Sequence, residues 1–572
     1  MSSSVKIVRF SSIFDSNVLQ DLTLDQNEYD SESDAFLEHH LTLLKSSENI
    51  SHDTFDLEEI RTTSLFSMSV KHQITKQVLD QIDFFSQYDL LVERIDFFFE
   101  QISDSATRNE ESVCRVVQDS RIFLNVEASW SVFICESQES DKSHSLSCML
   151  KNCLISNVCA TQLSNSLTEL VFHYDSFTST VDDHACEAAY LCSSEIKVTV
   201  LISLSNFVRM KSLYQNLSRL AENELKVKPL LLQQRYLNVE RLMTLMTVDS
   251  TERQVSLYIQ VIYKILREMA RELNPKFEID YHDFKRRILA TDLTSAQLES
   301  LNLRLDLLES FIATSNLRFK QSIKGNDWTF FFEKLIIVDL SCPFVNVDSA
   351  CALFEICLNV FLEQKMNIER VVALDETHKI DDVVNSRLKL VANIYYEIKF
   401  LRDFATAQKL TKSLVTIVRL QRHLACRVII VIQKLIISLK LLDLCSFILV
   451  HRFTSSNWMK ALKSHLAAVS MNTSTRTESD VIKQILVQIV NLNAEEILLF
   501  ASLIVLDVET VADQDEMIRW RLEKLDISYL KVHIRHRLTS DEEKSVLTIW
   551  HNASSTSSLK SSIDSEQSVM FE

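Results

Sequence analysis

The feature that most constrains the fold is an alternation of short apolar runs with longer amphipathic stretches. The apolar runs are four to seven residues long and read as buried strands: 131–135, 169–173, 197–203, 335–340, 371–374, 427–431 and 447–451. Helix-like stretches such as 347–364, 405–423 and 457–468 lie among them. Such alternation is typical of a parallel sheet with helices on both faces. The sequence therefore predicts an α/β fold built on a mostly parallel sheet flanked by helices.

The same pattern divides the chain into six segments. We predict an acidic segment that is disordered or loosely helical, a helical segment with patterns at 70–85 and 90–102, two core parts separated by a mostly helical insertion, and a disordered Ser-rich tail. In chain order these are residues 1–60, 61–110, 111–206, 207–325, 326–550 and 551–572. The core parts interrupted by 207–325 would form one sheet. Within that insertion, 255–273 and 295–314 are the strongest amphipathic stretches.

Composition adds one unusual constraint, because the 572 residues include one glycine and three prolines. This excludes collagen-like, linker-like and Pro-rich classes. It also removes the residue that adopts positive φ at helix ends and turns without steric cost. Other residues must occupy those positions, and we expect each such position to carry strain.

Charge and cysteine usage narrow the partners and the compartment. The formal net charge is −18, and thirteen acids against three bases lie in residues 1–60, which does not support a nucleic-acid partner or an anionic membrane surface. Residues 428–450 are interrupted by Lys434, Lys440 and Asp443, so we read them as two strands around a loop rather than a membrane span. The N-terminus lacks the apolar region of a signal peptide.

The twelve cysteines form no CxxC and no zinc-finger spacing, which predicts buried reduced thiols in an intracellular protein, cytoplasmic or nuclear.

A degenerate phosphate-binding loop follows the first strong strand. The segment 131–144 contains a strand and the pair Lys142-Ser143, and a helix is predicted next, at 146–154; this is the layout of GxxxxGK[ST]. Glu136 and Asp141 occupy the two glycine positions, and Glu139 occupies a third position that is often glycine. The strict motif therefore fails, while its lysine, its hydroxyl residue and its context remain.

Two further strands end in residues that suit the same chemistry. Residues 370–376 form an apolar strand ending in Asp375-Glu376, the layout of a Walker B segment, where an Asp holds the Mg²⁺ shell and the next Glu polarises water. Residues 428–433 form a buried strand ending in Gln433, which suits a sensor strand between the two Walker strands. The basic segments 419–423 and 451–452 are expected near the same sheet edge. On its own, Asp375-Glu376 also fits an ordinary acidic strand end.

With these segments, the chain resembles a family of uncharacterised fungal P-loop NTPase-like proteins of the additional-strand, catalytic-glutamate class. That family is distantly similar to hexameric DNA-pumping ATPases. The resemblance covers about residues 112–550 and rests on segments such as RVVALDETHKI and TIVRLQRHLACRVIIVIQK. The family's phosphate loop, similar to GSQGSGKSH, corresponds here to Glu136-Ser137-Gln138-Glu139-Ser140-Asp141-Lys142-Ser143-His144. Its sensor region, similar to STQEPTISP, corresponds to 431–439, with both prolines replaced.

The resemblance implies an ATP-hydrolysing ancestor that uses Mg²⁺ and can form a homo-oligomer. Lys142 would contact the β- and γ-phosphates, and Ser143 and Asp375 would hold the metal. Glu376 would be the general base and Gln433 the sensor of the γ-phosphate.

The acids in the loop predict that nucleotide binding is lost or strongly weakened. A carboxylate about 5 Å from a phosphate is repelled by about 3 kcal/mol per charge pair at an effective dielectric of 20. Each side chain forced to positive φ adds about 1–2 kcal/mol. Together these approach the roughly 8 kcal/mol of a micromolar site. An active ATPase or nucleic-acid translocase, a non-catalytic scaffold, and the product of a decayed duplicated gene are the alternatives. Single transitions from Gly and Pro codons account for the replacements, which favours decay.

Several residues have two readings. Arg419, Arg422 and Arg452 fit trans-acting arginine fingers or solvated and ion-paired arginines. His378 and His423 fit surface or packed histidines better than ligands. Residues 531–537 fit an edge strand guarded by charges better than a nucleic-acid contact.

Overall fold

The computed structural model describes somewhat more than half of the chain. The described residues are 52–77, 85–95, 119–135, 142–155, 161–162, 167–174, 185–194, 196–217, 224–247, 257–272, 279–313, 326, 334–364, 369–375, 394–432, 439–454, 462, 478–493, 495–512, 518–526 and 528–536. Two compact units divide the chain, Met1–Glu59 with Thr510–Trp520, and Ile60–Glu509 with Arg521–Glu572. The helix α2 (His52–Thr62) and the strands β14 (Val505–Ala512) and β15 (Ile518–Lys524) have residues in both units.

The second unit contains a sheet with a run of parallel strands, in the order β12–β4–β11–β10–β6–β9–β7–β8. These strands are β4 (Ser131–Cys135), β6 (Thr168–His173), β7 (Lys197–Ile202), β8 (Leu225–Pro229), β9 (Lys334–Asp339), β10 (Arg370–Asp375), β11 (Cys426–Ile432) and β12 (Phe447–Val450). All seven apolar runs expected as strands are confirmed, and the mostly parallel α/β fold with them. Residues 428–450 include most of β11 and all of β12, the two strands predicted there, and α14 (Leu439–Leu444) lies between them. No helix among the described residues is long and apolar enough to cross a membrane.

Antiparallel strands continue the sheet beyond β12, in the order β13–β16–β2–β3–β1, and β14 then pairs with β1 in parallel. They are β1 (Leu65–Ser67), β2 (Tyr88–Arg94), β3 (Arg121–Asn125), β13 (Glu496–Phe500) and β16 (Leu530–Ile534), and β5 (Thr161–Gln162) pairs with β2.

Two predictions in this part of the sheet were wrong. The segment 90–102 was expected as a helix, but its first residues belong to the strand β2. β2 pairs with β3 on one side and with β16 on the other, and this pairing overrides the helix-like spacing of its apolar residues. Residues 531–537 were expected as an edge strand, but β16 lies between β13 and β2. Its polar side chains contact glutamates of the neighbouring chain segment, with Lys531 Nζ 3.0 Å from Glu496 and His533 Nε2 3.2 Å from Glu495. The pattern at 70–85 is confirmed in its first part as α3 (Met68–Gln77).

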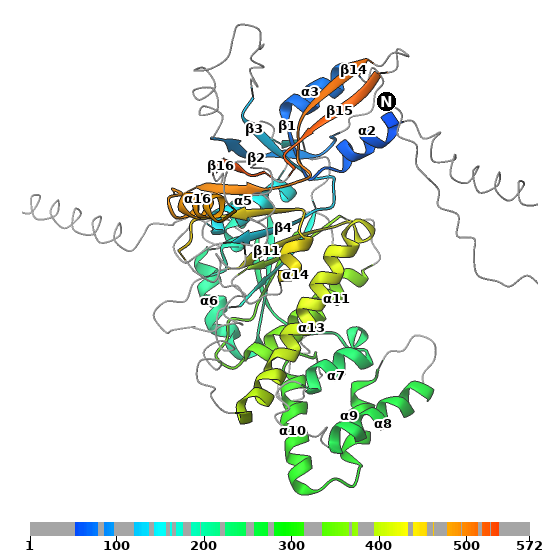
Figure 1. Cartoon of the computed structure of the whole chain (residues 1–572). Coiled ribbons are helices and arrows are strands. Elements are labelled where there is room, and N and C mark those ends of the chain that lie inside the picture. The colour runs from blue at the N-terminus through cyan, green and yellow to red at the C-terminus, as the bar shows by residue number, and fades with distance from the viewer. Residues whose placement is uncertain are drawn as a thin grey trace, which may run out of the picture. The chain divides into compact units, whose positions relative to one another are not determined.

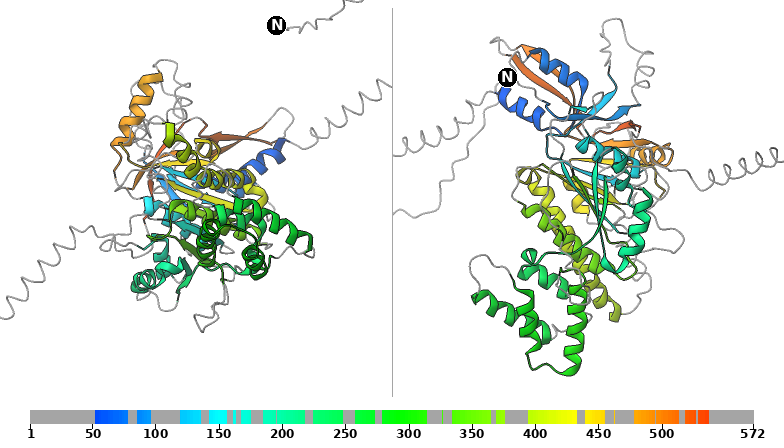
Figure 2. Two further views of the ribbon diagram at one scale, coloured as in Figure 1. Left: turned by 90° about the horizontal axis from the view of Figure 1, so that it is seen from below. Right: turned by 180° about the vertical axis from the view of Figure 1, so that it is seen from behind.

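Helices cover both faces of the parallel strands (Figure 1). On one face, α11 (Val347–Glu363) packs against α13 (Ile394–Leu424), and α13 packs against β11. On the other face lie α5 (Lys142–Leu154), the 3₁₀ segment η2 (Glu187–Ser194) and α6 (Phe207–Leu217), which the view from behind in Figure 2 shows. The central strands are buried on both faces, which is why they read as continuous apolar runs rather than as alternating patterns.

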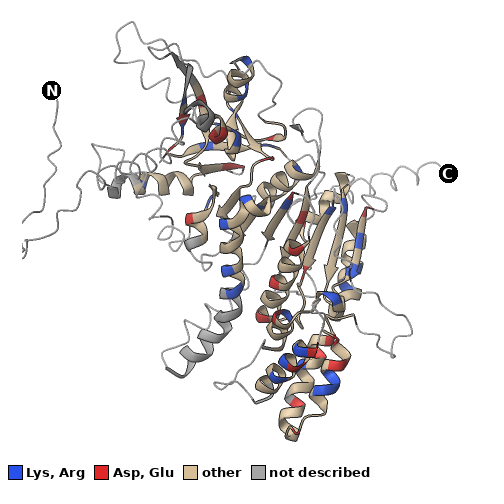
Figure 3. Ribbon diagram, turned by 90° about the vertical axis from the view of Figure 1, so that its right-hand side faces the viewer, with Lys and Arg blue, Asp and Glu red and all other residues tan. Residues whose placement is uncertain are grey.

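Between β8 and β9 the described chain is helical. These helices are α7 (Val239–Thr247), α8 (Leu257–Glu272), α9 (Tyr281–Leu289) and α10 (Ser295–Glu309). A further helix, α16 (Glu478–Val490), follows β12 in the sequence. The carboxylate of Asp280 caps α9 by accepting from the backbone N–H groups of His282 and Asp283. Both signs of charge are mixed over α7–α10 (Figure 3), and ion pairs such as Arg287–Glu272 join neighbouring helices.

The lack of glycine leaves a visible trace in the backbone. Among the described residues, Ala425, Glu495 and Asp526 adopt positive φ, at 46°, 67° and 51°. Ala425 stands between the end of α13 and the start of β11, where glycine is the usual residue. The expected strain therefore has a location. The described cysteines are free thiols and all are buried except the half-buried Cys445, as the sequence predicted.

Candidate functional site

The carboxyl ends of the central parallel strands meet at one edge of the sheet. Cys135 of β4 is paired with Ile432 of β11. On the other side of β11, Asp375 of β10 lies beside His173 of β6, which in turn lies beside Asp339 of β9. Ligands of parallel α/β sheets bind at this edge. The register therefore gathers the polar strand ends at the place where a site is expected.

The predicted phosphate loop follows β4 in the sequence and falls mostly outside the described residues. Residues 136–141, which include Glu136, Ser137, Gln138, Glu139, Ser140 and Asp141, are not described. Lys142 and Ser143 are the first two residues of α5, and only their backbone is described. The helix expected at 146–154 is present but begins earlier, at Lys142. His144 is buried, and its Nε2 lies 2.7 Å from the carbonyl oxygen of Arg535.

The predicted Walker B and sensor strands are neighbours, as expected. Asp375 is the last residue of β10 and is 3% exposed. Glu376 and Gln433 directly follow β10 and β11 and lie outside the described residues. β11 lies between β4 and β10. With neighbouring strands about 4.8 Å apart, β4 and β10 are separated by about 10 Å.

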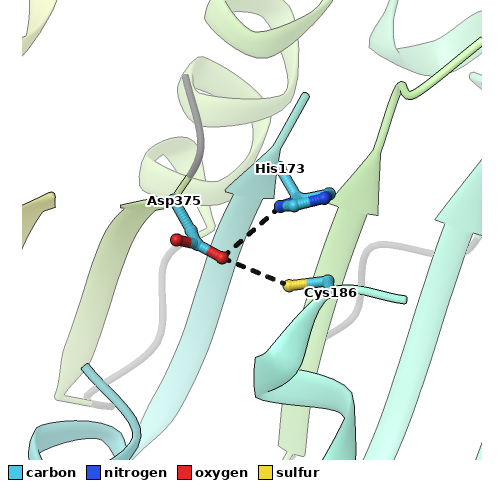
Figure 4. Close-up of side chains that lie close together, drawn as sticks. All are labelled: His173, Cys186 and Asp375. Atoms are coloured by element: carbon cyan, nitrogen blue, oxygen red, sulfur yellow. Dashed lines mark hydrogen bonds and ion pairs between the residues drawn. The ribbon is translucent and has the colours of Figure 1, made fainter. Parts of the chain in front are cut away.

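Asp375 does not face open solvent but a histidine and a cysteine (Figure 4). Its Oδ2 lies 3.4 Å from Nδ1 of His173 and 3.8 Å from Sγ of Cys186, which donates to it. Cys186 immediately precedes η2 and lies on the face of the sheet that η2 covers. His173 is 6% exposed and Cys186 is fully buried.

A second layer of hydrogen bonds fixes this cluster. The backbone N–H of Cys186 donates to the hydroxyl of Tyr214 at 3.0 Å, and that hydroxyl donates to Oδ2 of Asp339 at 2.7 Å. The other oxygen of Asp339 accepts from the backbone N–H of Ser341 at 2.9 Å. Cys186 is therefore tied through α6 to the end of β9.

Burial and mutual contact shift the proton affinities of the cluster. Burial raises the pKa of the Cys186 thiol to about 11, although the neighbouring His173 opposes that shift. Burial alone lowers the pKa of His173, but contacts with Cys186, Asp375 and Asp339 outweigh it and raise the pKa well above its usual value.

The donor set around Asp375 does not fit the Mg²⁺ that the family resemblance implies. Mg²⁺ demands hard oxygen ligands in near-octahedral geometry and keeps several waters. Here the nearest polar atoms to Oδ2 are an imidazole nitrogen and a thiol sulfur, both buried. No catalytic step that uses Mg²⁺ is therefore assigned to Asp375.

Sequence reasoning identified Asp375 but missed His173 and Cys186 as its neighbours. Both residues were visible, one at the end of a predicted strand and one among irregularly spaced cysteines. The signal that joins them is the strand order: β6 lies beside β10 although about two hundred residues separate their sequences.

The arginines expected near this edge divide into two groups. Arg419 and Arg422 are exposed in the last turns of α13, and β11 begins just after that helix, opposite the first residue of β10. They therefore lie at the amino edge of the sheet. The expected position was wrong because the chain enters β11 at this edge, opposite the carboxyl edge where the strand ends. His451 and Arg452 follow β12 at the carboxyl edge, as expected. His423 is exposed on α13, and His378 lies outside the described residues.

No family model matches the chain, and no curated protein matches its sequence. Among solved structures, the chain is similar to VirB4 of Thermoanaerobacter pseudethanolicus, at 11% sequence identity and a TM-score of 0.38. The match covers 76% of this chain and 99% of that one.

Proposed function

We propose that this chain is a P-loop NTPase-like protein, derived from an ATP-hydrolysing ancestor, whose nucleotide binding is lost or strongly weakened. The observation that carries the ancestry is the strand order β4–β11–β10. It places the strand before Lys142 two positions from the strand that ends in Asp375, with the strand before Gln433 between them. Three independent sequence predictions thus meet in one arrangement at one sheet edge.

The loss of binding follows from the residues that replace glycine. Glu136, Glu139 and Asp141 would bring carboxylates to a loop whose backbone N–H groups should converge on phosphates. Each would repel a phosphate by about 3 kcal/mol at 5 Å and an effective dielectric of 20. In this proposal Lys142 pairs with Asp141 or Glu139 and is not available to the β- and γ-phosphates.

The surroundings of Asp375 support the same conclusion independently. In an active site this carboxylate would belong to the shell of a hydrated Mg²⁺. Here it is buried beside His173 and Cys186. Ser143, Glu376 and Gln433 keep the ancestral residue types for metal binding, base catalysis and sensing, but the carboxylate that they would work with is engaged elsewhere.

Calorimetric titration of the full chain with Mg-ATP tests the proposal. We expect a dissociation constant weaker than about 100 μM, which corresponds to less than about 5.5 kcal/mol of binding free energy. Replacing Glu136, Glu139 and Asp141 together by glycine removes the three charges and should tighten ATP binding at least tenfold. Adding Lys142→Ala to that variant should abolish the gain, which shows that the restored loop binds through its lysine.

Two results would contradict the proposal. Tight binding of Mg-ATP to the unaltered chain, with hydrolysis that Lys142→Ala removes, would identify an active ATPase. A glycine-restored chain that folds, as judged by an unchanged thermal unfolding profile, but gains no affinity would show that the loop residues are not a degenerate nucleotide site.

A further inference from the structure

The cluster of His173, Cys186 and Asp375 combines the three side-chain types that bind zinc. The three possible ligand atoms lie within 4.8 Å of one another, and all three residues are buried. We propose that these residues bind a thiophilic divalent cation of the zinc class. This inference goes beyond the proposed function, because it requires no nucleotide and no phosphate loop.

The spacings of the ligand nitrogen and sulfur from Oδ2 of Asp375 approach those of a tetrahedral site. With metal–nitrogen and metal–oxygen bonds of about 2.0 Å and a metal–sulfur bond of about 2.3 Å, tetrahedral edges are about 3.3 Å for N···O and about 3.5 Å for S···O. The structure has 3.4 Å between His173 Nδ1 and Asp375 Oδ2, and 3.8 Å between Cys186 Sγ and the same oxygen. Small side-chain movements would bring all three atoms to bonding distance of one cation (Figure 4).

The imidazole of His173 provides a second, independent observation. Its Nδ1 is buried and lies at an ion-pair distance of 3.4 Å from Oδ2 of Asp375, but it makes no hydrogen bond to any group in the described part of the chain. A buried polar atom without a hydrogen bond is destabilising. This nitrogen points toward the cluster, where a cation would give it a bond.

Charge and softness select the class of cation. Cys186 would bind as the thiolate and His173 as the neutral imidazole, so binding releases to solvent the thiol proton and the imidazolium proton that the raised pKa of His173 favours. The thiolate and the carboxylate of Asp375 then together carry two negative charges. A divalent cation makes the buried site neutral, which removes the penalty for isolated charges in a medium of low dielectric. A thiolate and an imidazole favour Zn²⁺ and Co²⁺ over Mg²⁺ and Ca²⁺.

The surrounding residues resemble the outer layer of a metal site. The hydrogen bonds from Cys186 N–H to Tyr214 and from Tyr214 to Asp339 hold the cysteine in place. Such outer hydrogen bonds orient ligands and commonly change metal affinity 10–100-fold when removed.

Cobalt spectroscopy on the full chain tests the proposal without nucleotide. The protein is stripped with a chelator and titrated with Co²⁺. We expect one equivalent to bind with a sulfur-to-cobalt charge-transfer absorption in the near ultraviolet, and a stoichiometric amount of Zn²⁺ to displace it. A large excess of Mg²⁺ should leave the absorption unchanged. These measurements use the unaltered chain, so they do not depend on whether a variant folds.

Variants locate the site. Cys186→Ser should remove the charge-transfer absorption and weaken Zn²⁺ binding at least about a hundredfold, more than the loss of an outer contact. Cys192→Ser, in the adjoining η2 segment and equally buried, is the matched control and should keep both. His173→Gln should weaken Zn²⁺ binding while keeping a sulfur absorption at higher Co²⁺ concentration.

The proposal is overturned if Co²⁺ binds without a sulfur absorption, if Mg²⁺ displaces it, or if Cys192→Ser has the effect expected of Cys186→Ser. Failure here is distinguishable from failure of the proposed function, because the Mg-ATP titration depends on residues 136–143 and the cobalt titration does not.

Discussion

Tyr214 and Asp339 are joined by a hydrogen bond of 2.7 Å, in which the phenol of α6 donates to the carboxylate at the end of β9. The same phenol oxygen accepts from the backbone of Cys186 at 3.0 Å, so one buried hydroxyl connects a helix, a strand end and the chain entering η2.

Removing that hydroxyl should therefore loosen the carboxyl edge. Tyr214→Phe leaves the Cys186 N–H and one Asp339 oxygen without this partner in a buried place, and we expect a loss of about 1–3 kcal/mol of unfolding free energy. Denaturant titration measures it. Tyr263→Phe, at a 41% exposed tyrosine of α8, should change stability by less than about 0.5 kcal/mol. Equal effects of the two variants would contradict the assigned role.

Glu169 of β6 is a buried carboxyl whose two oxygens make no hydrogen bond within the described part of the chain. Burial raises its pKa well above the usual value. The folded state therefore holds the proton more tightly than the unfolded state, and stability is lost as pH rises above the unfolded pKa of about 4.3.

Glu169→Met should stabilise the protein by about 1–3 kcal/mol, because an unsatisfied polar group leaves the core. The gain should be larger at pH 8 than at pH 5, which chemical unfolding at both values measures. Glu299→Met, at an exposed position of α10, serves as the control and should show no such pH dependence. A destabilised Glu169→Met at both pH values would show that the carboxyl has a structural partner.

His451 shows the opposite pH dependence. It is buried after β12 and shares a hydrogen bond of 2.8 Å with the hydroxyl of Ser145. Burial, with a smaller contribution from His144, lowers the pKa of His451 to about 3. The unfolded state therefore binds the proton first, and stability is present above pH 6.5 and lost as pH falls toward 3. Between pH 7 and pH 5 the loss should be about 2 kcal/mol.

His451→Gln, which keeps a polar group but does not titrate, should remove that part of the acid sensitivity. Unfolding free energies of both proteins at pH 7 and pH 5 give the comparison. His423→Gln, at an exposed histidine, should retain the full loss. If His451→Gln loses as much stability as the unaltered chain, His451 is not the titrating group.

Ala425 provides a test of the strain left by the missing glycines. Its φ of 46° lies in the left-handed region, which is unfavourable by about 1–2 kcal/mol for a residue with a Cβ. Ala425→Gly relieves that strain but increases the freedom of the unfolded chain, so we expect a net gain of about 0.5–1 kcal/mol. Ala352→Gly, inside α11, should instead destabilise by at least about 1 kcal/mol. The same sign of change at both positions would contradict this account.

The sequence predicted the parallel strands well because each is buried on both faces and reads as an apolar run. It failed at β2, where a half-buried strand with a helix-like spacing acquires its structure from β3 and β16. It located Asp375, whose strand context is local. It could not place His173 and Cys186 beside it, because their proximity depends on strand order, which local patterns do not encode.

The position of β6 also has a consequence during synthesis. Its two neighbours, β9 and β10, are translated well after it, and β10 follows about two hundred residues later. Because β9 follows β6 after about 160 residues, at roughly 5–20 residues per second this strand waits about 8–32 s without either partner. The nascent chain thus carries an apolar segment with both backbone edges unpaired, and the stability of the finished sheet gives it no protection from aggregation in that interval.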